Sequence, residues 1–164
     1  MTTAYPYGAP ISLAHARKVA EPAVHEAQKE NLSIAVAIVD SAGGLVYYEK
    51  MDNTMFGSAS VAIDKARSAA AFKRPTKVFE EILAAGGVGL RILRLPGALP
   101  LDGGIPLVID GKIVGAIGVS GATSAQDAQC AKAGADALSA VLWLLGIVRI
   151  YPRARSQVHE RRNW

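Results

Sequence analysis

Residues 99–128, LPLDGGIPLVIDGKIVGAIGVSGATSAQDA, contain residue types and spacings that could build a binding or catalytic site. Asp102 precedes Gly103 and Gly104, and paired glycines let a ligand or another backbone approach the main chain closely. A carboxylate beside such an approach can transfer a proton. The structural alternative is an Asx turn that leads into a strand. We favour Asp102 as a candidate catalytic residue.

The same stretch ends where we expect a helix to begin. Ser124 and Asp127 form the S-x-x-D pattern of a capping box, which satisfies backbone donors at a helix start. Free N–H groups and the positive end of the helix dipole, near Gly121 to Ala125, also favour a bound carboxylate or phosphate. The Ser120 hydroxyl could add a donor there. A cap alone and a cap combined with an anion site both stay open.

The segment GVSGA at residues 118–122 is similar to the G-x-S-x-G turn that exposes the nucleophile of many serine hydrolases. Ala122 replaces the second glycine of that motif. The motif also requires a parallel sheet, whereas the strands predicted below are antiparallel. We therefore disfavour a serine hydrolase.

Cationic side chains are spaced along a predicted Ala-rich helix. Lys65 and Arg67 lie on this helix and Arg74 lies at its end, so they could pair with an acidic ligand. Such residues more often form a solvated helix face. Both interpretations remain open for Lys65 and Arg67.

The histidines do not indicate a zinc site. His15 and His25 are ten residues apart, and together with Cys130 and His159 they match no zinc-binding spacing. The chain also lacks a Walker A loop and a G-x-G-x-x-G motif. The sequence therefore supports neither metal, ATP nor dinucleotide chemistry.

Composition limits the class of protein. The 164 residues are 51% hydrophobic, which predicts one domain, because domains usually span about 100 to 150 residues. Aromatic residues make up only 6% of the chain, which disfavours nucleic-acid binding by base stacking. The net charge of +4 lies entirely in residues 146–164. We expect this basic tail to be solvated or to contact another subunit, with no nucleic-acid partner.

We expect no targeting segment from the residues of this chain. Residues 1–10 lack the charged and apolar regions of a signal peptide, and no apolar run reaches the ~20 residues that span a bilayer. The single cysteine, Cys130, excludes an intrachain disulfide. We expect a cytoplasmic protein without a membrane partner.

Periodicity and turn residues predict the elements that would position these side chains. Pro22 should kink the first helix, and Gly43 with Gly44 and Gly111 should form hairpin turns. The predicted helices are 11–30, 59–74, 76–85 and 125–145, and the predicted strands are 32–40, 45–50, 88–95, 105–110 and 113–121. This order predicts an α+β fold with a mostly antiparallel five-stranded sheet flanked by helices. We divide the chain into an N-terminal extension at 1–10, a domain at 11–145 and the tail at 146–164.

Three blocks of the sequence resemble a known family. They are AVAIVDSAGGLVYYEKMD at 35–52, AIDKARSAAAFKRPT at 62–76 and GGIPLVIDGKIVGAIGVSGATSAQDAQCAKAGADAL at 103–138. In order and spacing they resemble the GlcG/HbpS family of haem-binding or haem-degrading-type proteins, which is related to the C-terminal domain of some corrinoid adenosyltransferases. The resemblance covers roughly residues 10–145. It implies a profilin-like domain that assembles into dimers or larger rings such as octamers.

The resemblance also implies a pocket. Its residues would be Gly103, Gly104, Pro106 and Gly118–Gly121, together with Lys65 and Thr76. Two features depart from the family pattern. Lys50 stands where relatives commonly have arginine before the Met-Asp pair, and the Arg-rich tail has no counterpart.

Three functional interpretations follow, and we favour the first. In the first, the protein binds haem, another tetrapyrrole or a small anion, with acidic groups held by Lys65, Arg67 or the helix start at Ser124, and with His15 or His25 as the axial ligand of haem. The second is an enzyme of the isomerase or lyase type that acts on a small organic acid. It would use Asp102 as acid or base and an anion site at Ser120–Gly121. The third is an assembly subunit without chemistry, favoured by Ala- and Gly-rich surfaces that suit close packing.

Overall fold

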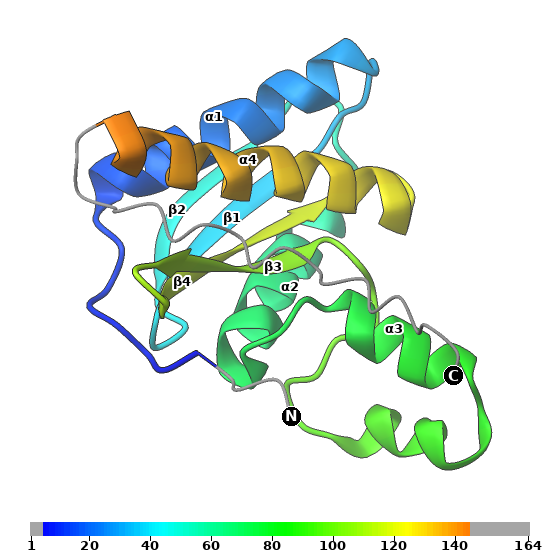
Figure 1. Ribbon diagram of the computed structural model, residues 1–164. Coiled ribbons are helices and arrows are strands. Elements are labelled where there is room, and N and C mark those ends of the chain that lie inside the picture. The colour runs from blue at the N-terminus through cyan, green and yellow to red at the C-terminus, as the bar shows by residue number, and fades with distance from the viewer. Residues whose placement is uncertain (1–4, 145–164) are drawn as a thin grey trace, which may run out of the picture.

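The computed structural model describes residues 5–144 (Figure 1). Residues 1–4 and 145–164, which include the whole of the predicted tail, lie outside the described residues. In chain order the elements are α1 (Leu13–Lys29), β1 (Ala35–Asp40), β2 (Leu45–Lys50), α2 (Ser58–Phe72), α3 (Lys77–Ala84), the 3-10 helix η1 (Gly87–Arg94), β3 (Gly104–Ile109), β4 (Lys112–Ser120) and α4 (Ser124–Leu144). All four predicted α-helices form, and α1 continues through Pro22.

The strands form one sheet in the order β2-β1-β4-β3, and every neighbouring pair is antiparallel. This confirms the α+β class with an antiparallel sheet. Strand β1 is central, and its residues Ala35 to Val39 are fully buried, as its continuous apolar sequence indicates. The chain joins β3 to β4 through a turn in which Asp110 and Gly111 both have positive φ, of 48° and 70°. The two turn residues are therefore Asp110 and Gly111, one residue earlier than the predicted Gly111 and Lys112.

The prediction of five strands was wrong, because the sheet has four within residues 5–144. The segment predicted as the extra strand, 88–95, lies mostly in η1. Gly86 and Gly87 have φ of +66° and +54°, which turns the chain back after α3. A Cβ atom on Gly89 would collide with the carbonyl group of Ile82, so η1 packs directly on the backbone of α3. The backbone conformation of Gly86 and Gly87 and the close packing at Gly89 therefore outweigh the β propensity of this segment.

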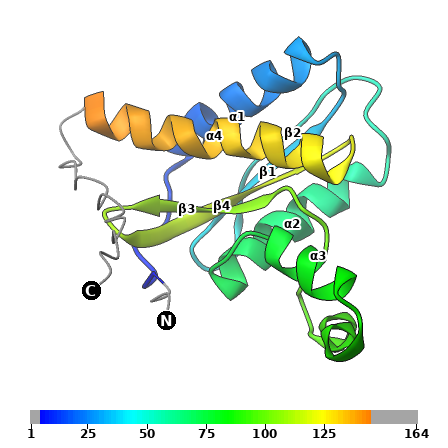
Figure 2. The same ribbon diagram turned by 45° about the vertical axis from the view of Figure 1, so that its right-hand side comes forward.

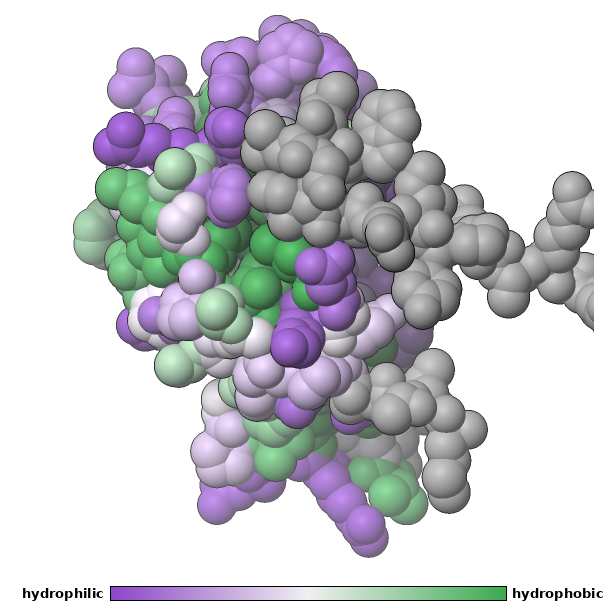
Figure 3. Space-filling model, turned by 60° about the vertical axis from the view of Figure 1, so that its left-hand side comes forward, coloured by the Kyte–Doolittle hydropathy of each residue, from purple (hydrophilic) through white to green (hydrophobic). Residues whose placement is uncertain are grey.

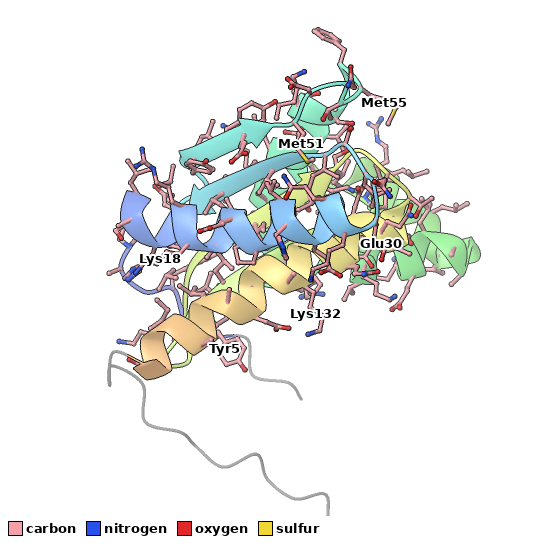
Figure 4. All side chains as sticks on the ribbon, turned by 90° about the horizontal axis from the view of Figure 1, so that it is seen from above. Tyr5, Lys18, Glu30, Met51, Met55 and Lys132 are labelled. Atoms are coloured by element: carbon pink, nitrogen blue, oxygen red, sulfur yellow. The ribbon has the colours of Figure 1, made fainter. Side chains whose placement is uncertain are left out.

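Helices cover both faces of the sheet. Helices α1 and α4 lie on one face and α2 on the other (Figures 1 and 2). Seen from above, α1 and α4 run side by side over the sheet (Figure 4). A Cβ atom on Gly134 of α4 would approach the carbonyl oxygen of Val19 in α1 to 2.5 Å, so these two helices are in close contact. The result is a three-layer arrangement with one apolar core on each side of the sheet.

The core between α2 and the sheet is made of small side chains. It contains Ala62, Ala66 and Ala69 of α2 and Ala37 and Ala116 of the sheet, all with no exposed surface. A Cβ atom on Gly118 of β4 would collide with the Ala62 carbonyl oxygen. Because the residues are small, α2 approaches the sheet closely and brings its polar residues against the ends of β3 and β4.

Candidate functional site

A buried ion pair connects α2, β4 and α4. Lys65 is 2% exposed, and its Nζ atom donates to Oδ2 of Asp127 at 2.8 Å and to the carbonyl oxygen of Val119 at 2.9 Å. Asp127 is also 2% exposed, and its Oδ1 atom accepts from the Ala122 amide at 3.0 Å. We call Lys65, Asp127, Val119 and Ala122 the Lys65–Asp127 cluster. Burial raises the pKa of the Asp127 carboxyl, and the hydrogen bond and charge of Lys65 oppose that rise.

The start of α4 is capped one residue earlier than predicted. Thr123 and Gln126 form the capping box: the Thr123 amide donates to Oε1 of Gln126 at 3.2 Å, and the Gln126 amide donates to Oγ1 of Thr123 at 3.4 Å. The predicted box of Ser124 and Asp127 is therefore wrong. Ser124 is already the first residue of α4, and Asp127 is engaged by Lys65 and Ala122.

The paired glycines are also held by the chain itself. The Gly103 amide donates to Oδ1 of Asp102 at 2.7 Å, and the Gly104 amide donates to Oγ1 of Thr76 at 2.9 Å. A Cβ atom on Gly103, whose φ is +117°, would lie 2.9 Å from Nζ of Lys65. The glycines thus allow β3 to approach the Lys65–Asp127 cluster. The amides of both glycines therefore donate to side chains of the protein.

Asp102 lies beside the first turn of α3. It is 6% exposed, its amide donates to Oε2 of Glu80 at 2.8 Å, and its Oδ2 atom is 3.9 Å from Nζ of Lys77. These contacts are those of a loop anchored to a helix. Asp102 lines none of the pockets described below, so no observation supports its predicted acid or base role.

The structure brings some predicted site residues together and separates others. Lys65, Thr76, Asp102, Gly103 and Gly104 meet where α2, α3 and β3 converge. Ser120 is 7% exposed at the end of β4, and Gly121 and the half-buried Ser124 follow it. The remaining candidates, Arg67, His15 and His25, line three separate pockets.

The first pocket lies between α1 and β2 and has a volume of about 650 Å³. Its lining residues are Arg17, Glu21, Pro22, Val24, His25, Gln28, Tyr47 and Glu49. We call it the His25 pocket. Tyr47 donates its hydroxyl hydrogen to Oε2 of Glu49 at 2.7 Å, and this bond, together with burial, raises the pKa of Tyr47. The pocket therefore combines an imidazole, a guanidinium, a phenol and carboxylates at an open surface.

Except for His25, the residues of this pocket were missed by sequence reasoning. The available signal was spacing: Arg17, Glu21 and His25 recur every four residues and so share one face of α1. Tyr47 and Glu49 alternate along β2 and so share one face of the sheet. The two faces meet only in the tertiary structure, and neither the spacing along α1 nor that along β2 predicts this contact.

The second pocket, of about 400 Å³, contains His15 and lies between the start of α1 and the β3–β4 turn. Its lining residues are Gly8, Ala9, Pro10, Ile11, Ser12, His15, Ile109, Asp110, Lys112 and Val114. We call it the His15 pocket. Figure 3, in which the left-hand side of Figure 1 comes forward, shows apolar residues gathered in the middle of that face.

The third pocket, of about 660 Å³, contains Arg67 and lies between α2 and the β1–β2 turn. Its lining residues are Tyr7, Ser41, Ala42, Gly43, Arg67 and Ala71. We call it the Arg67 pocket. Nε of Arg67 donates to the carbonyl oxygen of Gly43 at 3.3 Å, which holds the guanidinium against the turn.

Among residues 5–144, no three His, Cys, Asp or Glu side chains gather closely enough to hold a metal ion. None of the helices in that range combines the length and the apolar character that crossing a membrane would require.

Comparison with known proteins identifies the family. The family model described as "Haem degrading protein HbpS-like" matches residues 11–136, and the chain belongs to this family. GlcG of Escherichia coli K12 is 40% identical over 95 residues, which cover 58% of this chain and 69% of GlcG. The corrinoid adenosyltransferase PduO of Salmonella typhimurium is 27% identical over 124 residues, which cover 74% of this chain and 37% of PduO.

Solved structures show the same fold. The crystal structure of a double mutant of HbpS from Streptomyces reticuli superimposes with a TM-score of 0.72 at 33% identity, covering 79% of this chain and 87% of HbpS. The crystal structure of PduOC in complex with haem superimposes with a TM-score of 0.70 at 26% identity, covering 78% of this chain and 94% of PduOC. The predicted resemblance to the GlcG/HbpS family and to the corrinoid adenosyltransferases is thus confirmed.

Proposed function

We propose that this member of the HbpS-like family binds haem or a related tetrapyrrole in the His25 pocket. The observation that carries the proposal is that one open pocket contains both an imidazole and a guanidinium on the same face of α1. Histidine is a common axial ligand of haem iron, and arginine binds carboxylates such as the propionates of haem. Membership of the family and the haem complex of PduOC support this choice of ligand.

The residues of the His25 pocket fit such a ligand. Its volume of about 650 Å³ lies within the range of about 300–1,000 Å³ that is usual for small-molecule sites. The side chains of Pro22 and Val24 and the ring of Tyr47 provide apolar contacts for a macrocycle. Bound haem would supply an iron whose reactivity depends on its axial ligand and on the polarity around it. His25 would hold the iron, and Arg17 would orient the propionates.

The His15 pocket is the second candidate for the same ligand. Its walls are more apolar, with Ile11, Ile109 and Val114, and Lys112 provides a cation. Its volume of about 400 Å³ is smaller than that of the His25 pocket. The ammonium group of Lys112 acts as a point charge, whereas the guanidinium of Arg17 presents a planar pair of donors. We therefore place the ligand in the His25 pocket.

Titration with haemin tests the proposal. The protein should develop a Soret band with micromolar haemin, His25→Ala should abolish or strongly shift that band, and Arg17→Ala should weaken binding several-fold. His15→Ala is the matched control, because it removes an imidazole from the same helix outside the pocket. Loss of the band in His15→Ala alone would move the site to the His15 pocket. An unchanged haemin spectrum with the unmodified protein would refute haem binding.

We also propose that the chain forms a homo-oligomer through α3 and η1. These elements project from the layers of the molecule (Figure 2). They expose large apolar side chains. Val88 is 71% exposed, Leu90 52% and Leu93 61%. Clustered exposed apolar residues are typical of protein interfaces. Light scattering should give a mass above that of one chain, and Leu93→Asp should lower it; an unchanged mass in Leu93→Asp would exclude this surface.

A further inference from the structure

We propose that the Arg67 pocket binds the carboxylate group of a small organic molecule. This site is separate from the His25 pocket and does not depend on haem binding. It lies where the β1–β2 turn meets α2, and the two segments lie side by side in Figures 1 and 2. The proposal rests on three properties of the pocket: an oriented guanidinium, an excess of positive charge and small wall residues.

The guanidinium of Arg67 is oriented but has donors to spare. Its Nε atom is bound to the carbonyl oxygen of Gly43, and this contact fixes the plane of the group. Within residues 5–144, Arg67 makes no ion pair, and its two terminal nitrogens make no hydrogen bond. Even Asp64, three residues earlier on α2, forms no ion pair with it. An arginine held in this way presents two parallel donors, the arrangement that matches a carboxylate.

The pocket has positive charge without a lining acid. No Asp or Glu is among its lining residues. The neighbouring carboxylate of Asp40 is engaged by the turn itself, because its Oδ1 atom accepts from the amides of Ala42 at 2.8 Å and Gly44 at 2.9 Å. Lys73 does not line the pocket, but its Nζ atom lies 4.2 Å from the centre of the ring of Tyr7, which does. An anionic ligand would therefore meet the Arg67 guanidinium with no carboxylate opposing it among the lining residues.

The walls leave room for a ligand and suggest its shape. Ala42, Gly43 and Ala71 carry little or no side chain, so a ligand can approach the guanidinium. The Ser41 hydroxyl can donate to a carboxylate oxygen, and the Tyr7 ring gives an apolar surface. Tyr7 is fixed, since its hydroxyl donates to the carbonyl oxygens of Ala70 at 2.9 Å and Ala71 at 3.1 Å. These features suit a small acid with a carboxylate at one end and an apolar body.

Benzoate and its neutral analogue benzamide are the probes that test this site. In a two-dimensional amide NMR titration of the full chain, benzoate should shift the signals of Ala42 and Gly43 saturably, and benzamide should not. Arg67→Gln should weaken benzoate binding at least ten-fold, and Ser41→Ala two- to five-fold. Arg74→Gln is the matched control, because Arg74 is an exposed arginine close to the end of α2 that does not line the pocket. Arg67 is itself exposed, so its replacement should leave the fold intact.

Each outcome decides the proposal. Absence of saturable shifts with benzoate, equal shifts with benzamide, or equal weakening in Arg67→Gln and Arg74→Gln would overturn it. The carboxylate could also belong to a tetrapyrrole propionate, and haemin compared with its dimethyl ester separates these sources. If only haemin shifts Ala42 and Gly43, in a manner that needs Arg67, the small-acid proposal fails. Failure of haem binding in the His25→Ala variant leaves the benzoate result unchanged.

Discussion

The Lys65–Asp127 cluster and the His25 pocket contain similar side chains in opposite environments. In the cluster, one cation and one carboxylate are each 2% exposed, and their hydrogen bonds go to each other and to the backbone. In the pocket, Arg17 and His25 are exposed side chains that line an open cavity with a volume of about 650 Å³. Charged groups bonded within the protein hold elements together, whereas charged groups left at an open concave surface can bind a ligand. Within the segment 99–128, the amides of Gly103 and Gly104 and the carboxylate of Asp127 are bonded to groups of the protein itself.

The largest effect expected from this comparison is on stability. Lys65→Met would leave Asp127 buried without its cation, and breaking a buried pair in this way costs about 3–5 kcal/mol in the free energy of unfolding. Arg17→Met, at the open pocket, should cost no more than about 0.5 kcal/mol. Urea unfolding measures both variants.

A double variant provides the control for this prediction. Lys65→Met combined with Asp127→Asn removes the uncompensated charge while keeping an oxygen that can accept from Ala122. It should recover part of the lost stability. If Lys65→Met and Arg17→Met destabilise the protein equally, the distinction between the two regions is wrong.

The sequence predicts elements that depend on local spacing and misses contacts that depend on the tertiary fold. Apolar periodicity and hairpin turns gave the four helices and two hairpins, because these depend on local spacing. The segment 88–95 was wrongly predicted as a strand, because its helical path depends on Gly89 packing against the carbonyl of Ile82. Lys65 and Asp127 are 62 residues apart, and nothing in their spacing indicates that they are paired. A motif in the sequence does not show whether its donors already form hydrogen bonds with residues that are distant in the chain.

Cys130 lies on α4 close to the Lys65–Asp127 cluster. It is 1% exposed, and burial, with a smaller contribution from the charge of Asp127, raises its pKa from 9.0 to about 11. Below pH 9 the thiol is protonated in both the folded and the unfolded chain. Above pH 9 the unfolded chain ionises first, so stability should fall by about 2–3 kcal/mol as the pH rises to 11.

Unfolding measured from pH 8 to 11 tests this behaviour against Cys130→Ala. The substituted chain should lack this part of the pH dependence, although lysine and tyrosine ionisation will affect both proteins. At pH 8, a thiol reagent should modify Cys130 in the folded protein far more slowly than in urea. Rapid modification of the folded chain would show that the surroundings of the cluster are open to solvent.

A smaller loss of stability is expected for Asp102→Asn. This variant tests whether Asp102 contributes to ligand binding or only to the fold. Asp102→Asn keeps an oxygen that accepts from the Gly103 amide, and the pairing with the exposed Lys77 at 3.9 Å is weak. The free energy of unfolding should fall by about 1 kcal/mol or less, and haemin affinity should not change. A variant that folds normally and loses ligand binding would instead place Asp102 in the functional site.

The smallest effect is expected at the hydrogen bond between Tyr47 and Glu49 in the His25 pocket. This bond stabilises the protonated phenol, so the pKa of Tyr47 lies above its usual value of 10.0. The stability that the bond contributes is therefore present below pH 10 and is lost as Tyr47 ionises. Tyr47→Phe should therefore cost only about 0.5 kcal/mol at pH 7, because the site is half-exposed. In a titration of tyrosinate absorbance, the difference between the unmodified chain and Tyr47→Phe isolates this residue. Glu49→Gln should bring its pKa back towards 10, and an unshifted titration would mean that the phenol and carboxylate act independently in the pocket.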